Sequence, residues 1–404
     1  MPDLPSLNVL LHERRIASLT LLPGDSTLLI FEENYIGDQH RPTLSLSYKD
    51  VYGQLITQHR PTQTRVPPFF SNLLPEGPLR DYLAKRAGVN PSREFFLLWA
   101  LGQDLPGAVR IEAANDALWP GQQDSGNDAD AARRANALRF SLAGVQLKFS
   151  AVMQARGGLT IPASGQGGSW IVKLPSAFYP AMPENEFAMM GLARLVGIDA
   201  PETRLVPVGE IAELPEGIGQ VGGNAFVIKR FDRTDEGATV HVEDFAQIFG
   251  VFPERKYEEA NYRNIAKVIA TETGDEGVRE FIKRLVFNAL IGNADMHLKN
   301  WSLIYPGGRA AVIAPAYDFV STIAYIADDK MALKVGRSKR FDEFNRDQLS
   351  YLAAKASLPE KFVLDTARET VAAFDDLWPN AKKDLDMSSA LASAIEKHRK
   401  RVPL

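Results

Sequence analysis

Three polar side chains in the second half of the chain have the types and spacing that phosphoryl transfer requires. In the segment IGNADMHLKNWSLIYPGGRAAVIAPAYDFVS, Asn300 follows Asp295 by five residues, and Asp318 comes after a predicted hairpin. Phosphoryl transfer needs a carboxylate that accepts the proton of the attacking hydroxyl, together with oxygen ligands for Mg²⁺. Protein-kinase catalytic loops have the same Asp-to-Asn spacing, followed by a metal-binding Asp-Phe-Gly segment. We therefore predict that Asp295, Asn300 and Asp318 form a catalytic and metal-binding centre; the alternative is a polar turn with capping side chains.

Upstream, a lysine lies within an apolar, strand-like segment. Lys173 in SWIVKLP has apolar neighbours on both sides, and burying its ammonium is unfavourable unless anions are close. The phosphates of ATP are one such partner, and Glu184 or Glu186 in the following helix is another. The alternative is a surface lysine whose charged end reaches solvent. His297, two residues after Asp295, either orients the loop, contacts phosphate or is a structural hydrogen-bonding residue.

The segments around these residues predict a β-rich part followed by a helical part. Residues 1–111 contain short apolar runs such as STLLIF and TLSLSY before helix-like stretches, which predicts a small α+β unit. Residues 112–137 are rich in Asp, Asn, Gly, Gln and Ala and are predicted to be a linker or mobile loop. Residues 138–241 combine strand-like segments with one helix, and residues 242–404 are mostly helical, most clearly in VREFIKRLVFNALIG. The predicted fold class is therefore α+β, with a β-rich lobe, a helical lobe and a cleft between them.

Composition excludes several classes of protein. The chain has 404 residues, a formal net charge of −4, no cysteine and six histidines without an HExxH pair. Disulfides and thiolate metal sites are therefore excluded, and a protein that coats nucleic acid by itself is disfavoured. No apolar run approaches the roughly 20 residues of a membrane helix. We expect a soluble, cytoplasmic protein without a membrane partner.

The motifs together resemble the HipA family of bacterial toxin kinases, almost from end to end. FFSNLLPEG and LGQDLPGAV resemble motifs of the family's N-terminal subdomain. FSLAGVQLK, WIVKLP, NEFAMMGLARLVG, VIKRFDR, EDFAQIFG, GNADMHLKN and AYDFVS follow in the order of its kinase core. The resemblance implies a two-lobed, protein-kinase-like HipA fold with a small N-terminal subdomain (1–111), a linker (112–137), an N-lobe (138–241) and a C-lobe (242–404).

The resemblance also implies a site for ATP and Mg²⁺. Asp295 would be the catalytic base, Asn300 and Asp318 would bind Mg²⁺, Lys173 would hold the phosphates, and residues 143–148 would form the phosphate-binding loop. The residues implied in nucleotide binding are Ala143, Gly144, Val145, Gln146, Leu147, Lys148, Lys173, Lys229, Arg230, Phe231, Asp232, His297, Leu298, Lys299, Asn300, Tyr317, Asp318, Phe319 and Val320.

The implied function is that of the toxin in a type II toxin–antitoxin system. Such a toxin is a serine/threonine-protein kinase that transfers the γ-phosphoryl group of ATP to a translation-related protein, such as an aminoacyl-tRNA synthetase. It inhibits growth and would be inactivated by autophosphorylation, here at Ser141. Its partner would be a small helix-turn-helix, HipB-like antitoxin, through which the complex contacts operator DNA. Two alternatives stay open: a small-molecule phosphotransferase, and a non-catalytic nucleotide-binding scaffold that holds the antitoxin on DNA.

Overall fold

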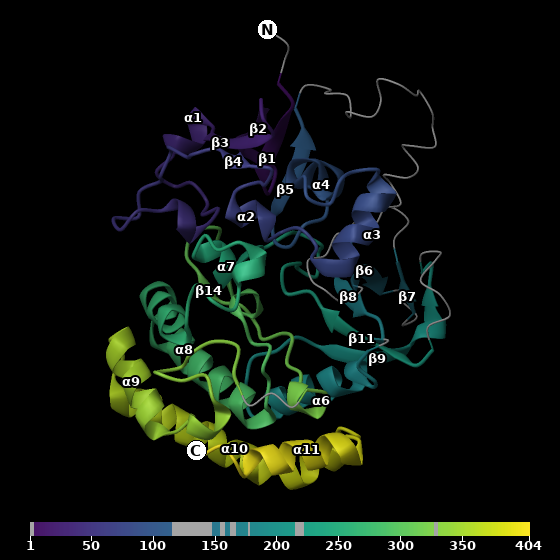
Figure 1. Cartoon of the computed structure of the whole chain (residues 1–404), viewed down its shortest axis with the longest axis vertical. Helices are drawn as coiled ribbons and strands as arrows, with labels where there is room; N and C mark the ends of the chain where they lie inside the picture. The colour runs from purple at the N-terminus through teal and green to yellow at the C-terminus, as the bar shows by residue number, and fades with distance from the viewer. Residues whose placement is uncertain are drawn as a thin grey trace.

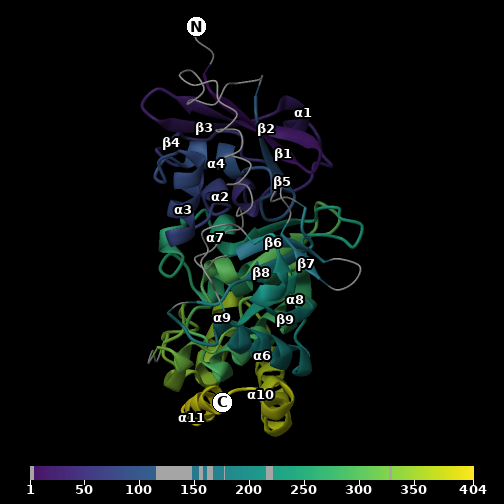
Figure 2. The ribbon, with the colours of Figure 1, turned by 90° about the vertical axis from the view of Figure 1, so that its right-hand side faces the viewer.

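The chain folds into an N-terminal unit, a six-stranded sheet and a helical part (Figure 1). The structure is a computed structural model that describes residues 4–114, 148–153, 158–161, 167–176, 178–214, 222–326 and 330–404. The N-terminal unit lies at one end of the long axis, and the last two helices lie at the other end (Figures 1 and 2). In these ranges, no helix combines the length and the apolar character that a membrane crossing requires.

The N-terminal unit is a five-stranded sheet covered by short helices. Its strands have the order β4-β3-β2-β1-β5, and all neighbours are antiparallel. Leu7, Val9 and Leu11 alternate along β1 and are at most 1% exposed, as expected for a strand with one face in the core. The elements of this unit are β1 (Ser6–Leu11), β2 (Arg14–Leu22), β3 (Ser26–Phe31), β4 (Thr62–Gln63), β5 (Val109–Ala113), α1 (Glu33–Ile36), α2 (Pro68–Ser71), α3 (Gly77–Ala87) and α4 (Glu94–Leu101).

Two details of this unit differ from the sequence-based expectation. The run TLSLSY forms no strand; it contains a 3-10 turn over Leu46–Tyr48 because the side chain of Ser45 accepts a hydrogen bond from Ser47 N and caps the turn. Strand β5 continues to Ala113, two residues into the predicted linker, because it pairs with β1. Residues 115–147, which contain the linker from 115 onward, lie outside the described ranges.

The six-stranded sheet has a different apolar core on each face. Its order is β10-β7-β6-β8-β11-β9. Along β11, Ala225 and Val227 pack with the apolar core of the N-terminal unit, whereas Phe226 and Ile228 pack with the core of the helical part. The sheet is therefore held between the other two parts. Its elements are β6 (Lys148–Met153), β7 (Leu159–Thr160), β8 (Trp170–Lys173), β9 (Thr203–Pro207), β10 (Ile211–Ala212), β11 (Asn224–Lys229) and the covering helix α6 (Met182–Leu195).

The helical part is built around one long buried helix, α8. This helix is kinked at Gly274 (φ 68°) and ends at Gly292 (φ 68°), where a Cβ atom would lie 2.4 Å from a side-chain carbon of Ile323. Glycine is therefore needed at the turn that begins the loop with Asp295. The elements are α7 (Phe245–Ile248), α8 (Tyr262–Ile291), α9 (Arg346–Ala356), α10 (Glu360–Asp384), α11 (Ser389–Arg399) and a three-stranded sheet of β12 (His241–Asp244), β13 (Ser302–Tyr305) and β14 (Val312–Ile313).

Polar contacts also join the N-terminal unit to the small three-stranded sheet. The carboxylate of Glu243 accepts hydrogen bonds from Ser45 Oγ (2.5 Å), Leu46 N (3.0 Å) and Tyr305 Oη (2.5 Å). Burial raises the pKa of Glu243 to about 7, although the three donors lower it. Next to it, His241 Nε2 lies 2.7 Å from Leu44 O. The N-terminal unit thus contacts the β-rich part and the helical part at once.

Candidate active site

The centre of the site is a buried lysine between two carboxylates. Lys173 Nζ on β8 lies 2.5 Å from Glu186 Oε1 on α6 and also forms an ion pair with Asp318. Burial would lower the pKa of Lys173, but the charges of Asp318 and Glu186 raise it. The same pairing holds the pKa of Asp318 well below its usual value against the effect of burial. Of the two glutamates considered from the sequence, Glu186 is the partner, while Glu184 accepts a hydrogen bond from Asn224 Nδ2 (3.0 Å).

A second lysine lies directly opposite the first. In the antiparallel pairing of β6 with β8, Lys148 is the partner of Lys173, so both side chains are on the same face of the sheet. Burial lowers the pKa of Lys148, whereas the charge of Asp318 opposes this decrease. Within the described part of the chain, no direct ion pair to its ammonium is formed. Lys148 is half-buried and lies on the same face of the sheet as Lys173.

The loop after α8 places a carboxylate at the surface of this region. Asn300 Nδ2 donates to Asp295 O (2.9 Å), and Asp295 N donates to Asn293 Oδ1 (3.0 Å), so the loop is fixed by its own amides. The side chain of Asp295 is 56% exposed, and Tyr257 Oη donates a hydrogen bond to its Oδ1. Burial of the surrounding region raises the pKa of Asp295, and the bond from Tyr257 lowers it. Asp295 therefore presents a carboxylate oxygen that accepts a hydrogen bond from a hydroxyl group, which is the contact that a general base makes with an attacking hydroxyl.

The His297 ring lies in the same region, and its backbone N donates to Asp295 O (2.8 Å). Its Nε2 lies 4.0 Å from Asp295 Oδ1, and its ring meets the Tyr257 ring edge-on at 4.9 Å. Burial lowers the pKa of His297 to about 3, so the imidazole is neutral at pH 7. Its Nδ1 is buried and has no hydrogen-bond partner among the described residues. A buried ring nitrogen without a partner fits a position that a ligand completes.

The segment with Asp318 is fixed by its two neighbours. Phe319 is fully buried, and its ring lies 5.3 Å from that of Phe287 on α8. Tyr317 Oη donates to Lys299 O (2.9 Å) and lies 2.5 Å from Ser302 Oγ. Asp318 itself has φ 57°, in the left-handed region that Asp tolerates better than most residues. These contacts turn the Asp318 carboxylate toward Lys173.

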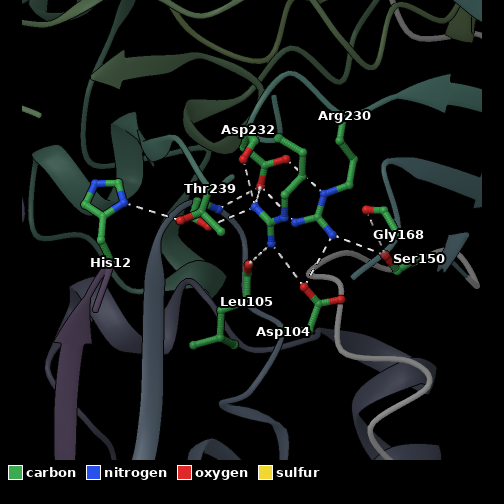
Figure 3. A network of polar contacts seen from close by, with 10 residues as sticks. His12, Asp104, Leu105, Ser150, Gly168, Arg230, Asp232 and Thr239 are labelled. Atoms are coloured by element: carbon green, nitrogen blue, oxygen red, sulfur yellow. Dashed lines mark hydrogen bonds and ion pairs between the residues drawn. The ribbon is translucent and has the colours of Figure 1, made fainter. Parts of the chain in front are cut away.

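Residues 229–232, the hinge, begin at the last residue of β11 and include predicted nucleotide-binding residues whose side chains form a buried ionic network (Figure 3). Arg230 donates to both oxygens of Asp232 (2.9 and 2.8 Å), and Asp232 also accepts from Arg233 Nη1 (2.9 Å) and Gly107 N (2.8 Å). Asp104 of the N-terminal unit lies 3.1 Å from Arg233 and 3.4 Å from Arg230. Burial would raise the pKa of Asp232, but the charge of Arg230 and its hydrogen bonds lower it to about 2. The side chains of Arg230 and Asp232 are thus bonded to each other and to the N-terminal unit.

The other predicted nucleotide residues divide into three groups. Lys229 pairs with Asp235 (2.6 Å) and lines an open cavity of about 440 Å³ together with Phe231, whose ring lies 5.7 Å from that of Tyr317. Leu298 is fully buried, and Val320 is half-buried. Ser141 and the predicted phosphate-loop residues before Lys148 lie outside the described ranges: Ala143, Gly144, Val145, Gln146 and Leu147.

The donor set at this site fits Mg²⁺ held together with phosphates. Among the described residues, no group of three or more His, Asp or Glu side chains forms a metal site made by protein alone. The carboxylate of Asp318 and the amide oxygen of Asn300 are the kind of oxygen donors that Mg²⁺ takes from a protein when phosphates supply the rest. Asp318 and Asn300 would therefore hold the ion only with a bound nucleotide.

Comparison with known proteins assigns the family. The HipA N-terminal domain matches residues 7–112, and the HipA-like C-terminal domain matches residues 140–378. The chain is 56% identical over its whole length to a Sinorhizobium fredii protein named "Putative kinase Y4dM", covering 98% of that protein. It is 27% identical to the "Serine/threonine-protein kinase toxin HipA" of Shewanella oneidensis, covering 70% of this chain and 68% of the relative.

A solved structure has the same fold. The HipA chain from the Shewanella oneidensis complex of HipA, HipB and operator DNA superposes with a TM-score of 0.73 and 21% identity, covering 98% of this chain and 95% of that one. This similarity confirms the predicted fold class, a two-lobed, kinase-like α+β fold behind a small N-terminal subdomain. Since both domain matches, the full-length relative and the fold agree, the chain belongs to the HipA family.

Proposed function

We propose that this protein is an ATP-dependent serine/threonine-protein kinase and the toxin of a type II toxin–antitoxin system. The observation that carries the proposal is the contact of Lys173 Nζ with both Glu186 and Asp318. In protein kinases, a strand lysine paired with a helix glutamate and a metal-binding aspartate in place are the two conditions of a competent site. Relatives named as kinases, one of them a toxin, support the same reading.

In this proposal each residue has one task. Lys173 and Lys148 bind the phosphates, and Asp295 accepts the proton of the attacking hydroxyl as the γ-phosphoryl group is transferred. Mg²⁺, held by Asn300 and Asp318, would offset the charge of the phosphates when bound. Because Arg230 and Asp232 bond with each other, the hinge would contact adenine and ribose mainly through its backbone.

The partners are proposed from the relatives. The solved Shewanella HipA was found with HipB and operator DNA, and we propose a HipB-like antitoxin for this chain, with operator DNA contacted mainly through the antitoxin. The acceptor is proposed to be a translation-related protein such as an aminoacyl-tRNA synthetase. Autophosphorylation of Ser141 is proposed to switch the enzyme off, because a phosphate would add about −1.5 to −2 charges beside the phosphate loop.

The test is transfer from γ-labelled ATP to proteins of a cell lysate, followed by identification of the labelled band. Asp295→Gln should lower the rate by about 10² or more, since a positioned base and its charge are lost. Asp318→Asn should weaken ATP binding in Mg²⁺ and leave binding in EDTA less affected, as measured by calorimetry. Activity of Asp295→Gln within a few-fold of wild type would remove the assignment. Mass spectrometry after incubation with ATP tests Ser141.

A further inference from the structure

One carboxylate of the N-terminal unit lies between two lysines that flank the proposed catalytic base. Glu76 directly precedes helix α3, and its Oε2 lies 2.8 Å from Lys256 Nζ, while its Oε1 lies 2.9 Å from Lys299 Nζ. Lys299 Nζ also donates to Asn72 O (2.9 Å). The side chains of Glu76, Lys256 and Lys299 are 14%, 11% and 9% exposed. The cluster is therefore largely withdrawn from solvent, where ion pairs are weakly screened.

The charges of this cluster are well defined. Burial would raise the pKa of Glu76, but the charges of Lys299 and Lys256 lower it to about 2, so Glu76 is ionised at neutral pH. Asp244, the residue before α7, also interacts with Lys299; burial raises its pKa to about 6. Without Glu76, two ammonium groups would remain close together in a poorly hydrated place, which is strongly unfavourable.

Both lysines belong to segments that bond directly to Asp295. Lys299 lies in the 3-10 turn Leu298–Asn300. In the sequence it stands between Asp295 and Asn300, whose side-chain amide donates to Asp295 O. Lys299 O accepts the bond from Tyr317 Oη, next to Asp318. Lys256 O accepts from Leu298 N (3.3 Å), and the next residue after Lys256 is the tyrosine that donates to Asp295. Displacing either lysine therefore displaces a group that holds the catalytic loop.

We propose that Glu76 is a positioning residue for phosphoryl transfer. It ties the catalytic loop and the 253–257 segment to the N-terminal unit, so that the unit supplies a necessary part of the active-site geometry. The inference rests on the proposed kinase function and goes beyond it, because Glu76 lies in the domain that carries none of the proposed catalytic residues. A shift of about 1 Å in a reacting group can cost about 10² in rate.

The test compares Glu76→Gln with a matched control, Glu254→Gln. Glu254 also forms an ion pair between the N-terminal unit and the 253–257 segment, with Arg65, but its side chain is 52% exposed and it contacts neither lysine. Glu76→Gln should lower kcat at least 10-fold and leave KM for ATP within about threefold. Glu76→Asp keeps the charge with a shorter reach and should give an intermediate kcat. Glu254→Gln should stay within twofold of wild type.

A second measurement tests the contact of Glu76 with Lys256 and Lys299 and does not depend on kinase activity. Brief acetylation with acetic anhydride, followed by mass spectrometry, should label Lys256 and Lys299 several-fold faster in Glu76→Gln than in wild type or Glu254→Gln. Faster labelling with an unchanged kcat would refute the positioning role. Unchanged labelling would show that Glu76 does not hold Lys256 and Lys299. If the wild-type protein transfers no phosphate to any acceptor, the proposed function fails; labelling still decides whether Glu76 holds the two lysines.

Discussion

Replacing Asp232 with Asn should lower the melting temperature of the protein by several degrees, because Asp232 is the anion of a buried network. It accepts four hydrogen bonds, three of them from Arg230 and Arg233 and one from the backbone of Gly107, at 2.8–2.9 Å. Gly107 has φ 77°, and a Cβ there would lie 2.8 Å from Val242 N, so this backbone donor cannot easily shift. The variant would leave two buried guanidinium groups with one remaining carboxylate.

The magnitude follows from the geometry. Removing one partner of a buried ion pair costs about 3–5 kcal/mol. With an unfolding entropy of about 2.1 cal/mol/K per residue, a chain of 404 residues loses about 1.2 °C per kcal/mol, so Asp232→Asn should melt about 4–6 °C lower. Asp104 makes longer and therefore weaker contacts, of 3.1 and 3.4 Å, than Asp232 does. Asp104→Asn should therefore cost about 1.5–3 kcal/mol, or about 2–4 °C.

Thermal unfolding followed by circular dichroism measures the order of these variants. The control is Glu13→Gln, which removes an ion pair with Arg110 (3.3 Å) at a glutamate that is 86% exposed, and should leave the melting temperature unchanged. If Asp232→Asn melted within about 1 °C of Glu13→Gln, the network would add no net stability. The reasoning about the hinge would then be wrong.

Four other substitutions test the site and its surroundings. Lys173→Met should lower the affinity for ATP, and it should lower the melting temperature by about 4–6 °C because two carboxylates lose their cation. Lys148→Met should lower the affinity for ATP alone, because it breaks no direct ion pair among the described residues. Tyr257→Phe should lower KM for the acceptor protein by about 3–10-fold, because the phenol hydroxyl must leave Asp295 before a substrate hydroxyl can bind there. A lower kcat at constant KM would instead show that Tyr257 orients Asp295. The pKa of Glu243 is about 7 in the folded protein against 4.5 in the unfolded chain. Between these two pH values, the free energy of unfolding of the wild type should therefore fall by about 3 kcal/mol relative to Glu243→Gln as pH rises. Parallel profiles of melting temperature against pH for the two proteins would contradict this.

Signals that are local in the chain predicted much of this architecture. The apolar neighbours of Lys173 correctly indicated a buried lysine that needs anions, and Glu186 was one of its two expected partners. The apolar periodicity before Gly292 and the turn residues after it correctly placed the end of a buried helix and the hairpin of β13 and β14. In each case, the residues that decide the structure are close in sequence.

Contacts between distant segments were not predictable in the same way. Lys256 and Glu76 are 180 positions apart, and Lys299 and Asn72 are 227 positions apart. From the sequence, a single glutamate directly before a helix indicates only a favourable interaction with the helix N-terminus. The hinge was predictable only in part. Asp232 is close enough to Arg230 in the sequence to bond with it, but only the fold shows that Asp104 also contacts Arg230. The catalytic and nucleotide roles of the site residues stay predictions until the variants are measured.

The two ionic clusters together affect how the six-stranded sheet and the helical part are held relative to each other. Asp104 and Gly107 bond to the hinge, while Glu76 and Asn72 bond to the catalytic loop. All four belong to one N-terminal unit, whose apolar core also continues into one face of the six-stranded sheet. A relative movement of the β-rich and helical parts about the hinge must therefore break contacts at one cluster or shift the whole unit. Because each cluster is largely buried, such a movement is unfavourable, so the N-terminal unit restrains the position of Lys173 relative to the loop that contains Asp295.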